Sequence, residues 1–389
     1  MNHEHRHDVL IVGGGVVGLA CAWSAARAGM SVAVIERDRV AAGASGIAAG
    51  MLAPVGEASW GEEGLLEFNL ASLRRWDSFA AALEADAGAG FGYSRIGALH
   101  VAADSDEAEQ LRHRHEVHRR HELEARWLRP SECRRLEPGL SSAIAGGVHA
   151  AHEATVEPAL LCSALVVAIR NRGGEIIEDA EVLAAERRRE EWTIRTAGDR
   201  ELSGGALVVS AGVWSAADWL PAGSRPPLRP IKGEILTLRG PAESPVCERI
   251  VAGDRVYMVP REDGRLIVGA TVEERGFDTT VSAGGVHELL REGYRLVPEI
   301  AELELAGVGA GLRPGTPDNL PVVGETADGL VLACGHFRNG VLQAPATGDA
   351  VAAILAGGEL APELAPLSPA RFGLRDVAAA SERAKAGAR

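Results

Sequence analysis

The N-terminal segment places a strand, a glycine-rich turn and a helix in immediate succession, and this arrangement constrains the fold more than any other feature. Residues 8–12 are a short apolar run of mostly β-branched side chains, typical of a buried parallel strand. The turn that follows has a G-x-G-x-x-G pattern at Gly13, Gly15 and Gly18. Residues 19–28 are rich in alanine and contain no helix breaker. The segment therefore predicts the first βαβ unit of a Rossmann fold.

Each glycine of this turn has its own physical task. Gly13 permits the tight turn, Gly15 lets the backbone approach a pyrophosphate, and Gly18 allows the helix to pack closely on the strand. The helix N-terminus presents free N–H groups and a partial positive charge to the phosphates. Glu36 ends the next predicted strand, over residues 31–35, where its carboxylate can accept hydrogen bonds from both ribose hydroxyls. These features predict a dinucleotide site that disfavours the 2′-phosphate of NADP.

The segment after Glu36 bears on the choice between FAD and NAD. Residues 37–51 are small and rich in glycine and alanine. A chain that passes close to a large, flat cofactor requires small side chains, which favours FAD. An ordinary flexible loop would have the same composition, so the segment by itself leaves both interpretations open.

Charge and composition disfavour several classes of protein. The formal net charge of −14 disfavours general affinity for nucleic acid or for anionic membranes, since both require a basic surface. The sequence contains no apolar run of the ~18 residues that a membrane span needs. The N-terminus lacks the apolar core of a signal peptide. We therefore expect a cytoplasmic protein without nucleic-acid or membrane partners.

The cysteines and the N-terminal histidines do not form a recognisable metal site. The five cysteines are odd in number, widely scattered, and form no C-x-x-C pair. We expect buried free thiols in a reducing compartment rather than disulfides or a zinc site. His3, His5 and His7 alternate along a polar segment that we expect to be a solvated tail. No metal is predicted.

The length and the order of elements predict two domains. A chain of 389 residues exceeds the usual limit of one hydrophobic core. A proline-rich linker at 221–230 leads into a group of antiparallel strands at 234–238, 256–260 and 265–270. The end of the chain returns to α/β character, with a strand at 330–333 and a helix at 347–355. We therefore predict an α/β protein, α+β overall, whose nucleotide-binding domain is discontinuous.

Other segments have clear local patterns. Helices are expected at 65–85, 107–123, 158–171 and 286–296. Strands are expected at 175–177, around Val182 and from 206 to about 210. This last strand breaks into a small-residue turn at Ala211 and Gly212, which can lie beside a cofactor seated on the first βαβ unit.

Two motifs near the C-terminus resemble those of glycine oxidases, FAD enzymes of the D-amino acid oxidase superfamily. They are residues 335–348 (GHFRNGVLQAPATG) and residues 311–321 (GLRPGTPDNLP). Shorter segments agree: 48–51 (AAGM), 208–215 (VVSAGVWS), 230–234 (PIKGE) and 259–271 (VPREDGRLIVGAT). The resemblance runs from the first strand to about residue 355, and the C-terminal pair is far more specific than the glycine turn.

The resemblance implies a fold, a cofactor and a reaction. It implies a Rossmann FAD-binding domain of the glutathione-reductase type over 1–85, 141–222 and 312–389. A mixed-sheet substrate domain over 86–140 and 223–311 is inserted into it. The cofactor is expected to be non-covalent FAD re-oxidised by O₂, and glycine would give glyoxylate, ammonia and peroxide. A role in thiamine biosynthesis and a homo-oligomeric state, dimer or tetramer, also follow from the resemblance.

The resemblance also implies which residues contact FAD. Those expected at the adenosine and pyrophosphate end are Val16, Val17, Glu36, Arg37 and, through its backbone, Val182. Those expected near the flavin are Ala44, Ser45, Ala49, Gly50 and Met51. Those expected to wrap the isoalloxazine ring are His336, Phe337, Arg338, Asn339, Gly340, Val341 and Leu342. In the last group, Gly340 would avoid a collision with the ring, and the N–H groups that lead into a helix would stabilise negative charge on the reduced flavin.

Arg313 and Tyr257 are the principal candidates for substrate binding. Arg313 matches the arginine that pairs with the substrate carboxylate in glycine oxidases, and we expect it on a rigid turn between glycines and a proline. A guanidinium fixes a carboxylate through two parallel hydrogen bonds. Tyr257 matches a nearby tyrosine whose hydroxyl can add a further hydrogen bond. Hydride transfer from a neutral amine requires no protein base, so no acid or base residue is predicted.

Other substrate contacts are expected at Met51, Arg338 and Arg255. Arg338 neighbours the flavin loop, and two roles are open for it: covering the pocket mouth or bracing the turn. Arg255 stands where glycine oxidases have a histidine, and Val272 replaces a methionine. These two departures bear on the substrate range more than on the reaction.

Three alternatives stay open from the sequence. The first is a sarcosine-oxidase-like enzyme, although residues 311–314 contain no cysteine of the kind that attaches FAD covalently in that group. The second is a D-amino acid oxidase or dehydrogenase. The third is a flavin-binding protein without catalysis, against which the intact motifs at Arg313 and Arg338 argue. Small amino acids and O₂ are the expected partners.

Overall fold

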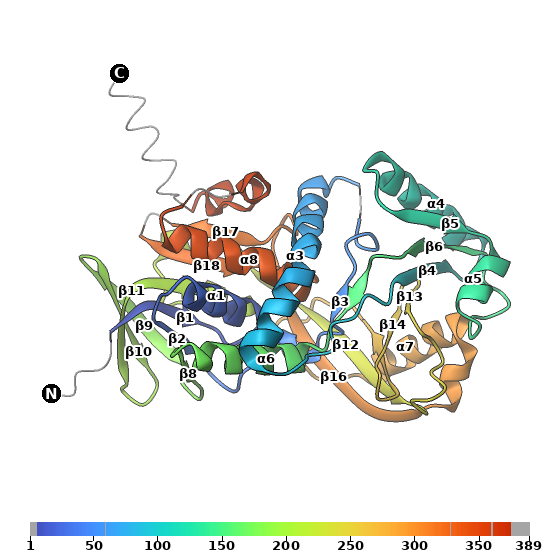
Figure 1. The fold of residues 1–389 in the computed structure, drawn as a ribbon, viewed down its shortest axis with the longest axis horizontal. Helices are drawn as coiled ribbons and strands as arrows, with labels where there is room; N and C mark the ends of the chain where they lie inside the picture. Colours follow the sequence, from blue (N-terminus) through green and yellow to red (C-terminus); the bar gives the residue numbers. More distant parts are fainter. Residues whose placement is uncertain (1–5, 59, 327, 359–360, 375–389) are drawn as a thin grey trace, which may run out of the picture.

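The fold is that of a computed structural model, which describes residues 6–58, 60–326, 328–358 and 361–374. His3 and His5 lie outside the described residues. Figure 1 shows two parts side by side, each built on one large sheet, with the long strands β12 and β16 running beneath the region where the parts meet. The site lies between these two sheets.

The first sheet carries the glycine turn. Its strand order is β17–β18–β11–β1–β2–β8, and β11 also pairs with the antiparallel β9–β10 hairpin. The strands are β1 (His7–Val12), β2 (Val32–Ile35), β8 (Glu175–Ile177), β9 (Val182–Arg188), β10 (Glu191–Thr196), β11 (Glu201–Val209), β17 (Val322–Glu325) and β18 (Leu330–Cys334). All pairs from β18 to β8 are parallel, as the buried β-branched runs predicted.

The two faces of this sheet are covered differently. Side chains alternate along β1, so that Val9 and Ile11 face the helices while Leu10 and Val12 face the β9–β10 hairpin. The helices on the first face are α1 (Val16–Arg27), α3 (Glu63–Ala87), α6 (Pro158–Asn171) and α8 (Gly340–Leu355). Helices on one face and the antiparallel strands β9 and β10 on the other agree with the predicted glutathione-reductase-type architecture.

The second sheet has the order β16–β12–β15–β14–β13–β4–β6–β5 and is mixed, because β13 and β4 run parallel while the other pairs are antiparallel. Its strands are β4 (Ala98–Ala102), β5 (Ala125–Leu128), β6 (Gly146–Ala150), β12 (Arg229–Arg239), β13 (Ile250–Ala252), β14 (Tyr257–Pro260), β15 (Arg265–Gly269) and β16 (Glu304–Gly315). One face packs on α7 (Ala283–Leu296) through Leu236, Met258 and Val268. The other face, with Ile235 and Tyr257, turns toward the first domain.

The remaining elements are short or peripheral. They are α2 (Ala44–Ile47), α4 (Ser105–Arg120), α5 (Pro130–Leu136), the paired strands β3 (Met51–Leu52) and β7 (Ala154–Thr155), and the 3₁₀ turn η1 (Gly212–Ala216). No helix among the described residues is both long and apolar enough to span a membrane. All five cysteines are buried and free, as predicted.

The structure differs from the sequence predictions at several boundaries. Helix α8 begins at Gly340 rather than at 347, because Ser72 and Trp76 of α3 donate hydrogen bonds to the Leu342 carbonyl and so anchor a helical turn that precedes Pro345. The segment 141–222, predicted to belong wholly to the FAD domain, includes β6, which pairs with β4 and β5 in the second sheet.

Two further predictions were wrong in detail. The segment 221–230 is not purely a linker, because β12 begins at Arg229. His7 is not in a solvated tail: it is the first residue of β1, it is buried, and its Nε2 lies 3.5 Å from Glu175 Oε2. The carboxylate of Glu175 gives the imidazole a polar partner at the end of the strand.

Candidate active site

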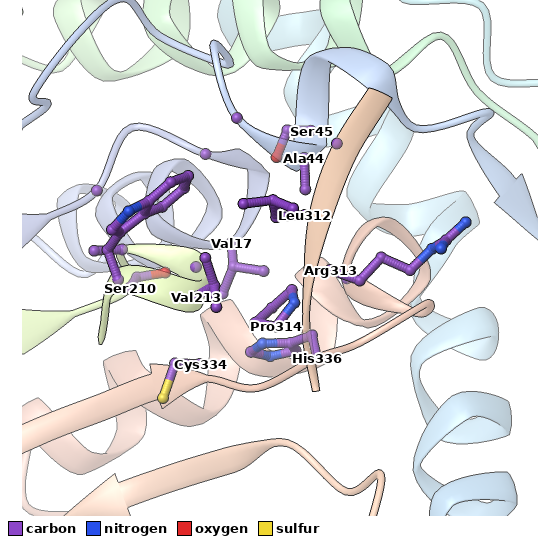
Figure 2. Close-up of a pocket in the computed structure, with 18 of the residues that line it drawn as sticks. Val17, Ala44, Ser45, Ser210, Val213, Leu312, Arg313, Pro314, Cys334 and His336 are labelled. Carbon is purple, nitrogen blue, oxygen red and sulfur yellow. The ribbon is translucent and has the colours of Figure 1, made fainter. Parts of the chain in front are cut away.

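A cavity of about 850 Å³ lies between the two sheets and is lined by both. Its wall includes the glycine turn, the segment 41–51, the 210–219 segment, the loop from Cys334 to Val341, and the strand residues Tyr257 and Arg313. Figure 2 shows that these side chains come from elements far apart in the sequence. The volume is at the upper end of the range for small-molecule sites, about 300–1,000 Å³.

The glycine turn is crowded by protein on the side away from the cavity. Gly13 has φ +113°, and a Cβ there would lie 2.3 Å from the Ser210 carbonyl oxygen. A Cβ at Gly18 would lie 2.0 Å from the Gly13 carbonyl oxygen, which is too close for any side chain. Gly18 does not line the cavity, and its contact with Gly13 holds α1 tightly against the end of β1.

Polar groups gather where β1, β2 and α1 meet. Glu36 Oε2 accepts a hydrogen bond from the Gly14 N–H (2.7 Å), and Oε1 accepts one from the Asp38 N–H (3.0 Å). Ser45 Oγ accepts a hydrogen bond from the Val16 N–H (3.0 Å) at the first turn of α1. The N-terminus of α1, the carboxylate of Glu36 and the hydroxyl of Ser45 therefore meet at one end of the cavity.

Aromatic side chains line the cavity beside this end. The Arg37 guanidinium lies 4.5 Å from the centroid of the Trp214 ring, and Trp214 in turn lies 5.9 Å from Phe277. Trp214 follows Ala211 and Gly212, which were predicted to lie beside the cofactor and which line the same wall, as does Val182. Trp214 belongs to the motif at 208–215 that resembles glycine oxidases, whereas Phe277 lies outside all the motifs identified in the sequence.

The loop between β18 and α8 forms the wall at the centre of the cavity. His336 is buried, its Nε2 lies 3.0 Å from Thr347 Oγ1, and burial lowers its pKa to about 3. Phe337 adopts a positive φ of 45° at the point where the chain turns into α8. A Cβ added at Gly340 would make ordinary van der Waals contacts, at 3.5 Å from His336 Cβ and 3.9 Å from Val17 Cγ2, so it would not collide with the protein itself. Asn339, Gly340 and Val341 line the cavity, so the start of α8 borders it.

Arg313 lies in a different local structure from the one predicted. It is on strand β16, paired with Ile231 of β12, and not on a turn. Figure 2 shows the side chains of Leu312 and Arg313 on opposite sides of the strand, with Leu312 on the side of Val17, and both residues line the same cavity. The Arg313 Nη1 donates to the carbonyl oxygens of Thr271 (3.1 Å) and Lys232 (3.4 Å).

Tyr257 lies beside Arg313. Burial raises the pKa of the Tyr257 hydroxyl, while the neighbouring Arg313 guanidinium opposes the rise. Glycines clear space for both side chains, since a Cβ at Gly269 would lie 2.6 Å from the Tyr257 hydroxyl and one at Gly233 would lie 2.3 Å from the Arg313 guanidinium. A cation and a neutral phenol therefore lie together in this part of the cavity.

A carboxylate that the sequence analysis missed also lines the cavity. Glu57 Oε2 lies 2.9 Å from Arg338 Nη2, and the two side chains are 23% and 39% exposed. Arg338 therefore lines the cavity and braces the loop before α8 against the loop that carries Glu57, while its role in covering the pocket mouth stays a prediction. No sequence pattern singles out Glu57, because its partner Arg338 lies far away along the chain.

Most of the predicted site residues line this one cavity, but three of them do not, and neither does Val272, the second departure from the glycine oxidases. Those that line it are Gly13, Gly15, Val16, Val17, Glu36, Arg37, Ala44, Ser45, Ala49, Gly50, Met51, Val182, Ala211, Gly212, Tyr257, Arg313, His336, Phe337, Arg338, Asn339, Gly340 and Val341. Leu342 is buried in the core beside α3, and Gly18 packs on Gly13. Arg255 is 62% exposed and its Nη1 lies 4.0 Å from Glu288 Oε1, and Val272 is 63% exposed.

The cavity fits a flavin dinucleotide in shape and in chemistry. At one end, the N-terminus of α1 is capped by Gly15, which has no side chain to block a pyrophosphate. The carboxylate of Glu36 lies beside it and can bind a ribose. The mostly small side chains at 41–51 and the absence of a side chain at Gly340 leave room for a flat ring system. The apolar residues Val17, Leu312 and Val213 lie together in this space in Figure 2.

Comparison with known proteins agrees with this geometry. The family model described as FAD dependent oxidoreductase matches residues 8–354. The chain belongs to this family. A glycine oxidase from Geobacillus kaustophilus (strain HTA426) is 34% identical to this FAD-dependent oxidoreductase over 371 residues, which cover 94% of this chain and 97% of the relative.

Solved structures give the same result for the fold of this FAD-dependent oxidoreductase. The crystal structure of glycine oxidase from Geobacillus kaustophilus matches with a TM-score of 0.87 and 34% identity, over 94% of this chain and 98% of that one. The structure of an iminodiacetate oxidase from Chelativorans sp. BNC1 matches with a TM-score of 0.84 and 27% identity, over 93% and 98% of the two chains. The predicted family and fold are thereby confirmed.

Proposed function

We propose that this FAD-dependent oxidoreductase oxidises glycine or a closely related small amino acid to the corresponding 2-oxo acid and ammonia. The observation that carries the proposal is the placement of Arg313 and Tyr257 side by side in the wall of the cavity that also has space suited to a flavin. The similarity to glycine oxidases supports the same substrate class. When bound, FAD supplies the acceptor for the hydride that leaves the α-carbon.

Arg313 is proposed to bind the substrate carboxylate. Its Nη1 donates to two backbone carbonyls and its guanidinium also interacts with the Tyr257 hydroxyl, and the guanidinium has more N–H donors than these contacts use. Tyr257 adds a hydroxyl donor, and its raised pKa keeps that hydroxyl protonated at neutral pH. Two donors on rigid strands orient the amino acid so that its α-carbon faces the flavin side of the cavity.

The rest of the cavity is proposed to serve cofactor binding. Val16 and Val17 would contact the pyrophosphate, and Glu36 would accept hydrogen bonds from the ribose. The first turn of α8 would lie near the part of the flavin that becomes negatively charged on reduction. The lowered pKa of His336 keeps its imidazole neutral, so this loop contributes helix N–H groups rather than a histidine cation. Met51 and Arg338 would border the substrate, whereas the position of Arg255 removes it from this proposal.

We propose that FAD is held without a covalent bond. Cys334 lines the cavity, but burial raises the pKa of its thiol to about 12, so it is a poor nucleophile. After acid precipitation, the yellow colour should appear in the supernatant. Colour retained in the protein pellet would refute this part of the proposal.

The proposed activity is tested by a substrate panel with peroxide detection. Glycine, sarcosine, D-alanine and iminodiacetate are offered to the FAD-saturated protein in air, and peroxide, ammonia and 2-oxo acid are measured. We expect peroxide with glycine and at least one of its small relatives, with O₂ as acceptor. Flavin reduction without peroxide would indicate a dehydrogenase, and no reduction by any member of the panel would refute amino acid oxidation.

The cellular role is proposed from the resemblance to glycine oxidases of thiamine biosynthesis. Such an enzyme would oxidise glycine and supply the product for formation of the thiazole ring. The cytoplasmic location and the homo-oligomeric state stay predictions from the sequence.

A further inference from the structure

Strand β12 presents two chemically distinct faces next to Arg313. Gly233 and Ile235 line the cavity. Lys232 and Glu234 belong to the opposite face, as the alternation of a strand requires, and both are completely buried on the side of α7. A buried lysine and a buried glutamate directly behind a binding site call for a physical explanation, because charged groups are rarely removed from water without partners.

The two buried charges form a compact ionic group with Glu273. Lys232 Nζ lies 2.7 Å from Glu234 Oε1 and 3.8 Å from Glu273 Oε1. Glu234 Oε1 also accepts a hydrogen bond from the Ser282 N–H (3.0 Å), next to the start of α7. The ionic group therefore ties β12 to the segment 271–273 and to α7.

Thr271 extends this group toward the cavity. Its Oγ1 donates to Glu273 Oε1 (2.9 Å) and accepts from the Glu234 N–H (2.9 Å). Lys232 and Glu273 also exchange two backbone hydrogen bonds, of 2.9 and 3.0 Å. The backbone of 271–273 is thus fixed against β12 by both side-chain and main-chain contacts.

The same two backbone segments carry the carbonyl groups that orient Arg313. The Thr271 and Lys232 carbonyl oxygens are the acceptors for Arg313 Nη1. Gly233, which follows Lys232 on β12, has no side chain and so allows the Arg313 guanidinium to lie against the strand. A change in the spacing of Lys232 and Thr271 would therefore tilt the guanidinium plane, on which two-point recognition of a carboxylate depends.

We infer that Lys232 is a positioning residue for Arg313, and that the buried group of Lys232, Glu234 and Glu273 sets the orientation in which the guanidinium receives a carboxylate. The inference rests on the proposed function, because it takes Arg313 as the carboxylate-binding side chain. Lys232 itself does not reach the cavity. Its effect passes through the Lys232 and Thr271 carbonyls.

The test measures carboxylate binding without turnover. Acetate is titrated into the FAD-saturated protein, and its Kd is obtained from the change in the flavin absorbance spectrum. The variants are Lys232→Met, the double variant Lys232→Met/Glu234→Gln, and the control Arg295→Met. The double variant removes the ion pair without leaving Glu234 as an unpaired charge, which makes it the safer variant to fold. Arg295 forms ion pairs on the same helix α7, but away from the cavity.

We expect the Kd for acetate to rise about tenfold in both Lys232 variants, as the loss of one good charge-assisted hydrogen bond would produce. FAD content and the Kd of the control should match the wild type. Unchanged acetate affinity in the double variant would overturn the inference. Loss of FAD together with acetate binding in the double variant would also overturn it, since the group would then serve the fold alone.

The result is separable from the test of the proposed function. If the wild type oxidises glycine but the Lys232 variants bind acetate normally, only this inference fails. If the wild type oxidises no amino acid but acetate binding responds to Lys232, the positioning role stands and the proposed substrate falls.

Discussion

Acid should destabilise this protein through one buried histidine that holds the loop carrying Glu57. His118 is 1% exposed, and its Nε2 donates to the Val55 carbonyl (3.0 Å), two residues before Glu57. Its Nδ1 is buried and has no hydrogen-bond partner among the described residues, so a second proton there would be unsatisfied. Burial is the largest cause that lowers the pKa of His118, from 6.5 to about 4.

The sign and size of the effect follow from the two pKa values. Because the folded pKa lies below the unfolded one, the unfolded chain binds the proton more tightly, and stability is lost as the pH falls from 6.5 toward 4. Each unit of pKa difference is worth about 1.4 kcal/mol. Between neutral pH and about pH 5, this single group should therefore reduce the free energy of unfolding by about 2 kcal/mol.

The assay compares wild type with His118→Gln, whose amide can still donate to the Val55 carbonyl but does not titrate. Urea unfolding of the FAD-saturated proteins is measured near neutral pH and near pH 5. Other titrating groups are common to both proteins and cancel in the difference. The wild type should lose about 2 kcal/mol more than the variant over this interval. An equal loss in the two proteins would refute the reasoning.

Three further predictions concern the cofactor turn, the substrate site and the thiols. Gly18→Val should abolish FAD retention, because even its Cβ would lie 2.0 Å from the Gly13 carbonyl oxygen; a purified variant with normal flavin content would contradict this. Tyr257→Phe should raise the KM for glycine about tenfold with FAD retained, as expected for the loss of a hydrogen bond of about 1.5 kcal/mol from the hydroxyl to a carboxylate. Steady-state kinetics at matched flavin content test this, and an unchanged KM would contradict it. The native protein should resist thiol reagents at neutral pH, because burial raises the pKa of Cys133 to about 11 and that of Cys162 to about 12; titration of the thiols before and after denaturation tests this, and rapid modification of the folded protein would count against it.

The sequence predicted the parts of the fold that depend on local chemistry. The strand over residues 8–12 follows from its apolar, β-branched run, and the turn and the close packing of α1 follow from the steric needs of Gly13 and Gly18. Helix α6 has the predicted bounds because Pro158 starts it and the glycines after Arg172 end it. In both cases the signals lie within one or two turns of the element that they define.

The sequence could not predict features that depend on pairing across the chain. The placement of Arg313 on a strand follows from its register with Ile231 of β12, which no local pattern reveals, since the glycines and the proline around it are typical of a turn. Glu57 became a site residue only because folding brings it to Arg338. Lys232 has no local signal of burial, because Glu273, which pairs with it through its carboxylate and its backbone, comes from a distant segment of the chain.

The measurement that tests the central claim most directly is anaerobic titration of the FAD-saturated protein with glycine, followed through the flavin absorbance. We expect glycine to bleach the flavin of the wild type. Arg313→Ala should keep its FAD but require at least about tenfold more glycine for half-bleaching, because it loses a charge-assisted pairing with the carboxylate. A flavin that glycine, sarcosine and D-alanine all fail to bleach would contradict the proposed reaction, and an Arg313→Ala variant that titrates like the wild type would contradict the proposed site.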